Sequence, residues 1–277
     1  MPDRDQATAD GELPAWSLPA GAEERLAPNW PDGVTREWAL GGATGTGVRV
    51  AIVDSGIDAG HPLVGGVDRA VVVTGGEDEI AVAEDSEGDA SGHGTACAGI
   101  VRALAPGVEL ASVRVLGPDS TGSGDILLAG LRWAVEEGYD VVNMSLSTRK
   151  RQFALALHDL ADRAFFARTV LVCSAHNLAI ESYPWRFASV ISVGSHELTE
   201  PLVWHYNPRP PVEFFARGVD VEVAWPGGES LLATGNSLAT PHLTGVCALM
   251  LSKHPELTPF QLKSILYLTA TNVADGP

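Results

Sequence analysis

Four polar side chains lie beside apolar segments in positions that suit acyl-transfer chemistry. Asp54 ends the run VRVAIVD, and His93 stands among small residues in SGHGTACAGIV. Asn177 follows TVLVCSA, and Ser237 opens a long apolar run. A hydroxyl nucleophile needs a base, a group that orients the base and a donor that stabilises the oxyanion. The four residues would supply these roles in the chain order Asp, His, Asn, Ser.

Each of the four residues also has an ordinary structural explanation. An aspartate or asparagine after a strand often forms a turn, and a serine often caps a helix. The chain has eight histidines, so residue type alone does not single out His93. The occurrence of all four in one order favours the catalytic interpretation. A helix that starts at Ser237 is compatible with it, because a helix N-terminus stabilises an oxyanion.

The elements that must position these residues are short apolar strands that alternate with amphipathic helices. Continuous apolar strands indicate a sheet that is buried on both faces. The alternation predicts an α/β chain with a three-layer α/β/α fold and a mostly parallel central sheet. In such sheets, sites form at the carboxyl ends of strands. We expect strands over 48–54, 69–73, 110–116, 140–146, 169–174 and 188–193, and helices over 93–104, 124–137, 152–167, 237–253 and 259–270.

The composition argues against some classes of partner. The 277 residues are 45% hydrophobic, which indicates a packed globule. A total of 18 basic and 35 acidic side chains gives a net charge of −17, which argues against nucleic acid and anionic membranes as partners. The charge slightly favours basic substrates, although solubility explains it equally well. The sequence gives no indication of the oligomeric state.

Cysteine usage and the lack of targeting segments predict a cytoplasmic protein. Cys97, Cys173 and Cys247 lie in apolar runs and cannot all pair, which favours buried thiols in a reducing compartment. None has the spacing of a metal site, and we expect no metal and no other cofactor. The first residues lack a signal-peptide pattern, and no apolar run reaches the roughly 18 residues of a membrane helix.

Two segments are expected to differ from the alternating pattern. Residues 1–45 are rich in proline, glycine and acidic residues, which predicts a partly disordered N-terminal arm before a single domain over 46–277. The acidic segment 75–92 is expected to be a solvated loop. Its carboxylates offer oxygen ligands for a cation, but they lack a fixed ligand spacing.

Three motifs resemble those of the subtilisin-like serine peptidases, peptidase family S8. VAIVDSGID (50–58) resembles the Asp motif of the family, GHGTACAG (92–99) its His motif and GNSLATPH (235–242) its Ser motif. Their order is that of the subtilisin triad, which differs from the orders of other triad hydrolases. SAHN (174–177) resembles the oxyanion segment. The resemblance covers about residues 40–270, nearly the whole chain.

This resemblance implies a role for each polar residue. Ser237 would attack the scissile carbonyl, His93 would carry its proton to the leaving amine, and Asp54 would hold the imidazole. Asn177 and the backbone N–H of Ser237 would bind the oxyanion. A protein or peptide in extended conformation would add as a strand to two edge strands, 121–125 and 145–148. The implied substrate-binding residues are Gly122, Ser123, Gly124, Ser145, Leu146, Ser147, Thr148 and His176.

Departures from the family pattern lie beside the expected specificity pocket. His176, Ser147 and Thr148 stand where glycine is common in the family, and their side chains are expected to narrow the pocket. Glu181 falls near the expected pocket floor, where a carboxylate would favour a basic residue before the cleaved bond.

The sequence therefore predicts a selective serine endopeptidase that acts on a specific protein or precursor peptide through an acyl-enzyme. Two alternatives stay open. A peptide ligase or macrocyclase would use the same acyl-enzyme but exclude water in favour of an amine. A catalytically silent peptide-binding protein would use only the substrate cleft.

Overall fold

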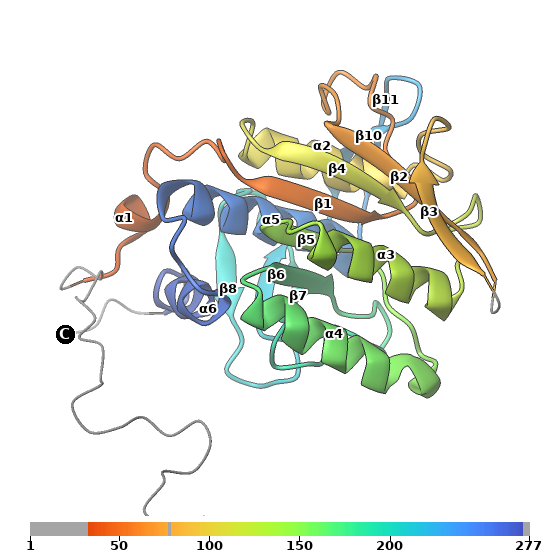
Figure 1. Ribbon diagram of the computed structural model, residues 1–277. Coiled ribbons are helices and arrows are strands. Elements are labelled where there is room, and N and C mark those ends of the chain that lie inside the picture. Colours follow the sequence, from red (N-terminus) through yellow and green to blue (C-terminus); the bar gives the residue numbers. More distant parts are fainter. Residues whose placement is uncertain (1–32, 77–78, 274–277) are drawn as a thin grey trace, which may run out of the picture. The chain divides into compact units, whose positions relative to one another are not determined.

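A computed structural model describes residues 33–76 and 79–273 of the chain (Figure 1). The main sheet contains β1 (Arg49–Asp54), β2 (Arg69–Gly75), β3 (Ile80–Glu84), β4 (Glu109–Arg114), β5 (Val141–Met144), β6 (Val170–Ser174), β7 (Ile191–His196), β8 (Trp204–Tyr206) and β9 (Phe214–Arg217). Their order is β3-β2-β4-β1-β5-β6-β7-β9-β8. The inner pairs are parallel, and only the edge strands β3 and β8 run antiparallel to their neighbours.

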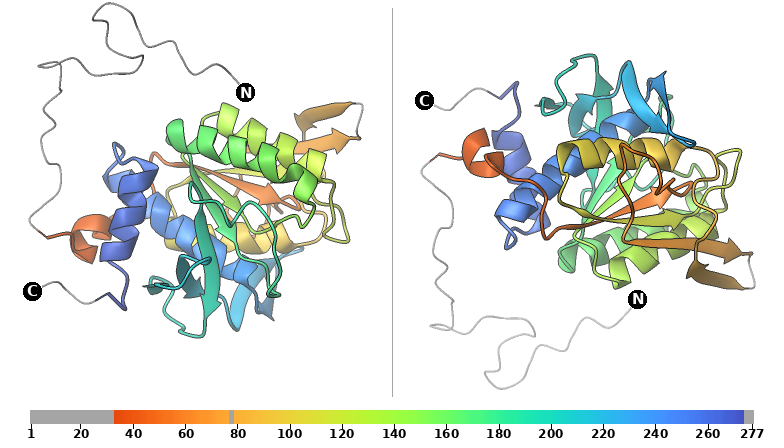
Figure 2. Two further views of the ribbon diagram at one scale, coloured as in Figure 1. Left: turned by 90° about the horizontal axis from the view of Figure 1, so that it is seen from below. Right: turned by 90° about the horizontal axis from the view of Figure 1, so that it is seen from above.

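Helices cover both faces of this sheet. The α-helices of the described residues are α1 (Arg36–Leu40), α2 (His93–Leu104), α3 (Gly124–Glu136), α4 (Ala154–Phe166), α5 (Asn236–Lys253) and α6 (Pro259–Leu268), of which α2 to α5 contact the sheet. The pair α3 and α4 lies on one face, and α2 and α5 lie on the other (Figure 2). A separate hairpin of β10 (Val221–Trp225) and β11 (Glu229–Ala233) packs beside α2. The predicted three-layer α/β/α fold is confirmed.

Burial explains why the inner strands read as continuous apolar runs. Every residue of β5 and β6 is buried, as is every residue of β1 after its first. α5 is buried along its length from Leu238 to Leu251, so it has no polar face. A helix that is apolar all round belongs in the interior. This places Ser237 at the start of a helix that the core holds on every side.

The predicted elements appear with shifts of a few residues at their ends, and β3 is a correction. Residues 75–92 were expected to form a loop, but 80–84 pair with β2 as an antiparallel edge strand. All five residues of β3 are exposed, and the short apolar run IAVAE stands between acidic residues that favoured a loop. The short strands β8 to β11 were also missed.

The described part of the chain includes a segment before β1. Thr35 caps α1 by accepting a hydrogen bond from the backbone N–H of Trp38, and the ring of Trp38 lies 4.2 Å from that of His254. Residues 1–32 lie outside the described residues, and the division at residue 45 stays a prediction. None of the helices in the described ranges is long and apolar enough to span a bilayer.

Candidate active site

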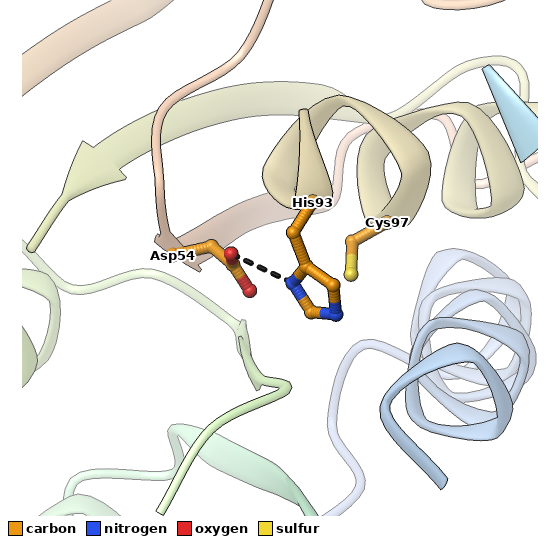
Figure 3. Close-up of side chains that lie close together, drawn as sticks. All are labelled: Asp54, His93 and Cys97. Carbon is orange, nitrogen blue, oxygen red and sulfur yellow. Dashed lines mark hydrogen bonds and ion pairs between the residues drawn. The ribbon is translucent and has the colours of Figure 1, made fainter. Parts of the chain in front are cut away.

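Asp54 and His93 meet at the point where β1 ends and α2 begins (Figure 3). Asp54 is fully buried, and its Oδ1 lies 2.8 Å from Nδ1 of His93. The backbone N–H of Ser55 donates to the same oxygen at 2.8 Å. The His93 side chain is 27% exposed. The pair therefore consists of a buried carboxylate and an imidazole that solvent and substrate can reach.

The electrostatics of the pair favour a histidine that accepts protons. The negative charge of Asp54 raises the pKa of His93 above its ordinary value, and burial of the ring opposes this effect. The hydrogen bond to Asp54 and the charge of Asp89 also raise the pKa. An imidazole in this environment is a stronger base, and the imidazolium that forms when it takes a proton is stabilised.

A small-residue contact allows the two elements to approach each other. A Cβ atom added at Gly94 would lie 2.0 Å from the carbonyl oxygen of Gly56, which follows β1 closely in sequence. No side chain fits between the first turn of α2 and this loop. Glycine at position 94 is therefore required for His93 to reach Asp54.

Asp89 is a supporting residue that sequence analysis missed. Its Oδ1 accepts hydrogen bonds from Ser55 Oγ at 2.7 Å and from the backbone N–H of Gly92 at 2.8 Å. Its Oδ2 accepts from the backbone N–H of Thr95 at 2.8 Å and from the Thr95 hydroxyl at 2.5 Å. Asp89 thus ties the residues on both sides of His93 to the end of β1. The available signal was an acid four residues before the histidine.

Ser237 is the second residue of α5, and a proline later in the helix affects its backbone. Pro241 has no N–H to donate to the carbonyl of Ser237 four residues earlier. The hydroxyl of Ser145 donates to that carbonyl instead, at 2.7 Å. Ser145 in turn accepts from Nδ2 of the buried Asn143 at 3.2 Å. Ser145, the residue after β5, therefore fixes the backbone of Ser237, the candidate nucleophile.

Asn177 lies beside the N-terminus of α5. Its Oδ1 accepts a hydrogen bond from the backbone N–H of Asn236 at 2.9 Å. This bond fixes the orientation of the amide, so that the NH₂ group points away from the N–H of Asn236. A Cβ added at Gly235 would lie 3.1 Å from Ser237 Oγ and 3.6 Å from Asn177 Nδ2. The hydroxyl and the amide therefore flank one small space, which any side chain at position 235 would enter.

Asn236 is a second residue whose contribution sequence analysis missed. Its Nδ2 donates to the carbonyl of His176 at 3.3 Å, and its Oδ1 accepts from the backbone N–H of Ser195 at 2.9 Å. The side chain thus connects the start of α5 to the oxyanion segment and to β7. The available signal was an asparagine directly before the candidate nucleophile.

One cavity brings three of the four predicted residues together. It has a volume of about 280 Å³, and His93, Asn177 and Ser237 line it. Asp54 does not line this cavity, but its carboxylate contacts His93. Within the described residues, no hydrogen bond joins His93 to Ser237. Catalytic hydrogen bonds of unliganded enzymes are often long and shorten when substrate binds. The arrangement suits nucleophilic attack on a carbonyl placed in this cavity.

The predicted substrate-binding residues line this cavity or a neighbouring one of about 430 Å³. Two details differ from the expected edge strands. Residues 121–123 form a loop, and Gly124 and Asp125 already begin α3. Ser123 Oγ caps that helix by accepting from the N–H of Ile126. The N–H and carbonyl of Thr148 both pair with Tyr183 at 2.9 Å, so this backbone is already occupied.

Glu181 does not lie where a basic substrate residue would meet it. Its carboxylate accepts from Arg151 at 2.6 Å and from the Tyr183 hydroxyl at 2.7 Å, and it lies 3.3 Å from Arg186. The hydrogen bonds from Tyr183 and Arg151 lower its pKa. Glu181 lines neither cavity. The expectation of a basic residue before the cleaved bond therefore loses its structural basis.

An arginine outside the acidic segment 75–92 forms ion pairs with two of its carboxylates. Arg114 lies 2.7 Å from the buried carboxylate of Asp85 and 2.8 Å from the exposed carboxylate of Glu87. Its guanidinium group neutralises carboxylates that stood out as candidate cation ligands. The pair also fastens the end of β4 to the loop after β3.

Cys97 lies next to the Asp54–His93 pair (Figure 3). Ligand atoms of the three residues lie within 4.8 Å of one another. Burial raises the pKa of the Cys97 thiol well above its ordinary value, so the group stays protonated. A protonated thiol is a poor metal ligand and a poor nucleophile. Its Sγ lies 3.8 Å from the carbonyl oxygen of Ser237 and contributes a weak donor.

Comparison with known proteins agrees with this geometry. The model of the subtilase family, Peptidase_S8, matches residues 45–277. Subtilisin DY of Bacillus licheniformis is 33% identical over 250 residues, which cover 85% of this chain and 88% of that protein. Subtilisin E of Bacillus subtilis (strain 168) is 34% identical over 252 residues, which cover 85% of this chain and 63% of that protein.

A solved structure gives the same result. A cold-adapted subtilisin-like serine proteinase superposes with a TM-score of 0.65 at 28% identity, which covers 81% of this chain and 82% of that chain. The family model, the sequence identity and the superposition all extend over the domain that carries the site. The chain therefore belongs to the subtilase family of serine peptidases and is a serine endopeptidase.

Proposed function

We propose that the protein is a selective endopeptidase in which Ser237, His93 and Asp54 form the catalytic triad. Ser237 Oγ attacks the scissile carbonyl while His93 Nε2 takes its proton. The imidazolium then protonates the leaving amine, and an acyl-enzyme forms on Ser237. Water, with His93 again as base, releases the second product. Asp54 keeps the proton of the neutral imidazole on Nδ1.

The observation that carries this proposal is the 2.8 Å contact between Asp54 Oδ1 and His93 Nδ1 beside a cavity that Ser237 also lines. A hydrogen bond at Nδ1 leaves Nε2 as the acceptor that a serine hydroxyl needs. A surface aspartate–histidine pair would be hydrated, whereas this carboxylate is fully buried.

Asn177 and the start of α5 supply the oxyanion site in this mechanism. The Asn177 amide group is oriented by the N–H of Asn236 and lies on the same side of Gly235 as Ser237 Oγ. The backbone N–H of Ser237 has no intrahelical partner because it is in the first turn of α5. These two donors would bind the developing negative charge, which is often the largest single contribution to catalysis.

Selectivity follows from Ser147 and His176, which line the first cavity, and from the hydrogen bonds that hold Ser147. Ser147 donates to Ser182 Oγ at 3.0 Å, and Trp185 Nε1 donates to the same oxygen at 2.8 Å. Together with His176, this network would reduce the room for a substrate side chain next to the cleaved bond. An extended peptide would pair with the backbone of Ser145–Ser147, since that of Thr148 is occupied.

We further propose that residues 46–277 carry the activity and that the protein acts in the cytoplasm. Cys97, Cys173 and Cys247 are buried and unpaired. Burial also raises the pKa of Cys173 and Cys247, so all three thiols would be inert in a reducing compartment. Fractionation of the cells that produce the protein tests the location.

Labelling with a fluorophosphonate probe tests the triad. We expect labelling of the native protein, loss of labelling in Ser237→Ala, and no change in Ser264→Ala, which alters a serine on the remote helix α6. Absence of Ser237-dependent labelling in folded protein would contradict the proposal. Product masses then separate hydrolysis from ligation, because hydrolysis adds one water and cyclisation does not. Cleavage of many unrelated sites in casein would contradict selectivity.

A further inference from the structure

A basic segment borders the cavity of about 430 Å³ (the second cavity), although the net charge of the chain is −17. Arg149, Lys150 and Arg151 directly follow the segment that would bind the substrate. Arg149 and Lys150 are exposed, and both line the cavity of about 430 Å³ together with His176 and Ser147. His176 and Ser147 also line the first cavity, so the two spaces adjoin.

The positive charges of Arg149 and Lys150 are not neutralised by nearby acids. Over residues 33–76 and 79–273, neither side chain has an ion pair or a hydrogen bond. No acidic residue of these ranges lines the cavity. In the described ranges Asp119, next to the lining residue Ser120, forms no ion pair with either cation, and Glu181 is held by arginine side chains. Two cations therefore border a cavity that no carboxylate of the described residues lines.

The segment that carries the two cations is anchored at both ends. Before it, the backbone of Thr148 forms two hydrogen bonds with Tyr183, each of 2.9 Å. After it, the N–H of Phe153 donates to the carbonyl of Lys150 at 3.1 Å. The Phe153 ring is buried against Gly124, where an added Cβ would lie only 2.1 Å from a ring atom. The two side chains thus extend from a backbone whose position is set by packing.

The position of His93 indicates which half of a substrate reaches this cavity. His93 must protonate the leaving amine, so the leaving half of the peptide passes on its side. His93 lines the first cavity but not the second. The second cavity therefore receives the acyl half, which consists of the residues before the cleaved bond.

The spacing of residues along the chain indicates how far Arg149 and Lys150 lie from the cleaved bond. The Ser145 hydroxyl contacts the carbonyl of Ser237, and Arg149 lies four residues further along the chain. A paired peptide advances about 3.3 Å per residue, in step with the segment beside it. A side chain about three to five residues before the cleaved bond would then lie beside Arg149 and Lys150.

We propose that Arg149 and Lys150 form a subsite for acidic side chains about three to five residues before the cleaved bond. The inference rests on the proposed peptidase function and adds the class of substrate. It reverses the expectation of basic substrates from the net charge. At physiological salt, acidic side chains more than a Debye length of about 8 Å from the bound peptide are largely screened. The charges of Arg149 and Lys150 would instead act directly on a side chain bound in the subsite. An acidic precursor peptide fits this arrangement.

The test uses internally quenched peptides in pairs that differ only by Glu or Gln at one position, placed from two to six residues before the cleaved bond. A mixed peptide library read by mass spectrometry first supplies a cleaved parent sequence. We expect kcat/KM to favour Glu about 3- to 10-fold within the proposed window, because exposed ion pairs are individually weak. The ratio should fall toward one at high salt and should be near one for pairs placed after the cleaved bond.

Matched variants assign the preference to the two side chains. The ratio of Glu to Gln should fall to about one in Arg149→Ala/Lys150→Ala and invert in Arg149→Glu/Lys150→Glu. Arg132→Ala/Arg209→Ala removes two exposed arginines elsewhere and should keep the native ratio. Thermal unfolding checks that each variant is folded. The ratio is internal to each variant, so a general loss of activity does not affect it.

Fluorophosphonate labelling of the native enzyme distinguishes failure of the proposed peptidase function from failure of the acidic-subsite proposal. Loss of Ser237-dependent labelling would contradict the peptidase mechanism itself. An enzyme that labels normally but cleaves Glu and Gln peptides equally, or cleaves only peptides that lack acidic residues, would overturn the acidic subsite alone.

Discussion

Acidification should destabilise the fold through His242, a buried residue of α5. The side chain is 4% exposed, and its Nδ1–H donates to the carbonyl of Leu238 at 2.9 Å. Burial lowers its pKa from the ordinary value of 6.5 to about 4, and the nearby charges of Arg217 and His196 act in the same direction. The folded protein therefore holds this histidine neutral under conditions in which the unfolded chain is protonated.

The sign and size of the effect follow from these two values. Above pH 6.5 the ring is neutral in both states, and stability does not depend on it. Between pH 6.5 and about 4 only the unfolded chain binds the proton, so each pH unit costs about 1.4 kcal/mol. The total is about 3 kcal/mol, a large part of the roughly 5–15 kcal/mol that typically stabilises a domain.

The assay is urea unfolding from pH 7 to pH 4 in a Ser237→Ala background, which prevents self-digestion. His242→Asn replaces the ring by an amide that still donates from the position of Nδ1. We expect the protein with the native histidine to lose about 3 kcal/mol more than this variant over that pH interval. His158→Gln, on the exposed face of α4, is the matched control and should change the pH dependence little, because the 3.7 Å contact of His158 with Asp162 is exposed to solvent. Parallel pH profiles for the His242→Asn variant and its parent would refute the reasoning.

Four further perturbations test the site. Asp54→Asn should lower kcat about 10⁴-fold, measured on a cleaved peptide, because the imidazole would adopt the wrong tautomer. Asn177→Ala should lower kcat by about 10²- to 10³-fold with little change in KM. Asp89→Asn removes a charge that raises the pKa of His93, so the acidic limb of the kcat/KM profile should move to lower pH, since only neutral His93 accepts a proton. An unmoved limb would show that Asp89 acts through structure alone. Gly124→Ala places a Cβ 2.1 Å from an aromatic carbon and should cost about 1–3 kcal/mol in thermal unfolding.

Sequence alone predicted those features that depend on local pattern. The helix over 93–104 appears with the predicted bounds, because small residues give it a continuous buried face. The inner strands were predictable because burial on both faces leaves unbroken apolar runs. β3 was missed although four of its five residues, IAVAE, are apolar, because the acidic residues on both sides of this short run favoured a solvated loop.

The supporting residues of the site could not be predicted because their roles depend on contacts distant in sequence. Ser145 contacts a carbonyl 92 residues away, and Asp89 contacts Ser55 across 34 residues. Neither pairing leaves a spacing that a single sequence reveals. Glu181 shows the opposite error: its position near the pocket was plausible, but three partners turn its carboxylate away.

The backbone of α5 couples catalysis to substrate recognition. Pro241 leaves the carbonyl of Ser237 without its helical donor, and a buried carbonyl without a partner is costly. The hydroxyl that satisfies it belongs to Ser145, the first residue of the segment along which a peptide would pair. A shift of that segment would therefore move the nucleophile as well as the substrate. The same segment continues into Arg149 and Lys150, so the proposed acidic subsite, the peptide-binding backbone and Ser237 are positioned by one stretch of chain.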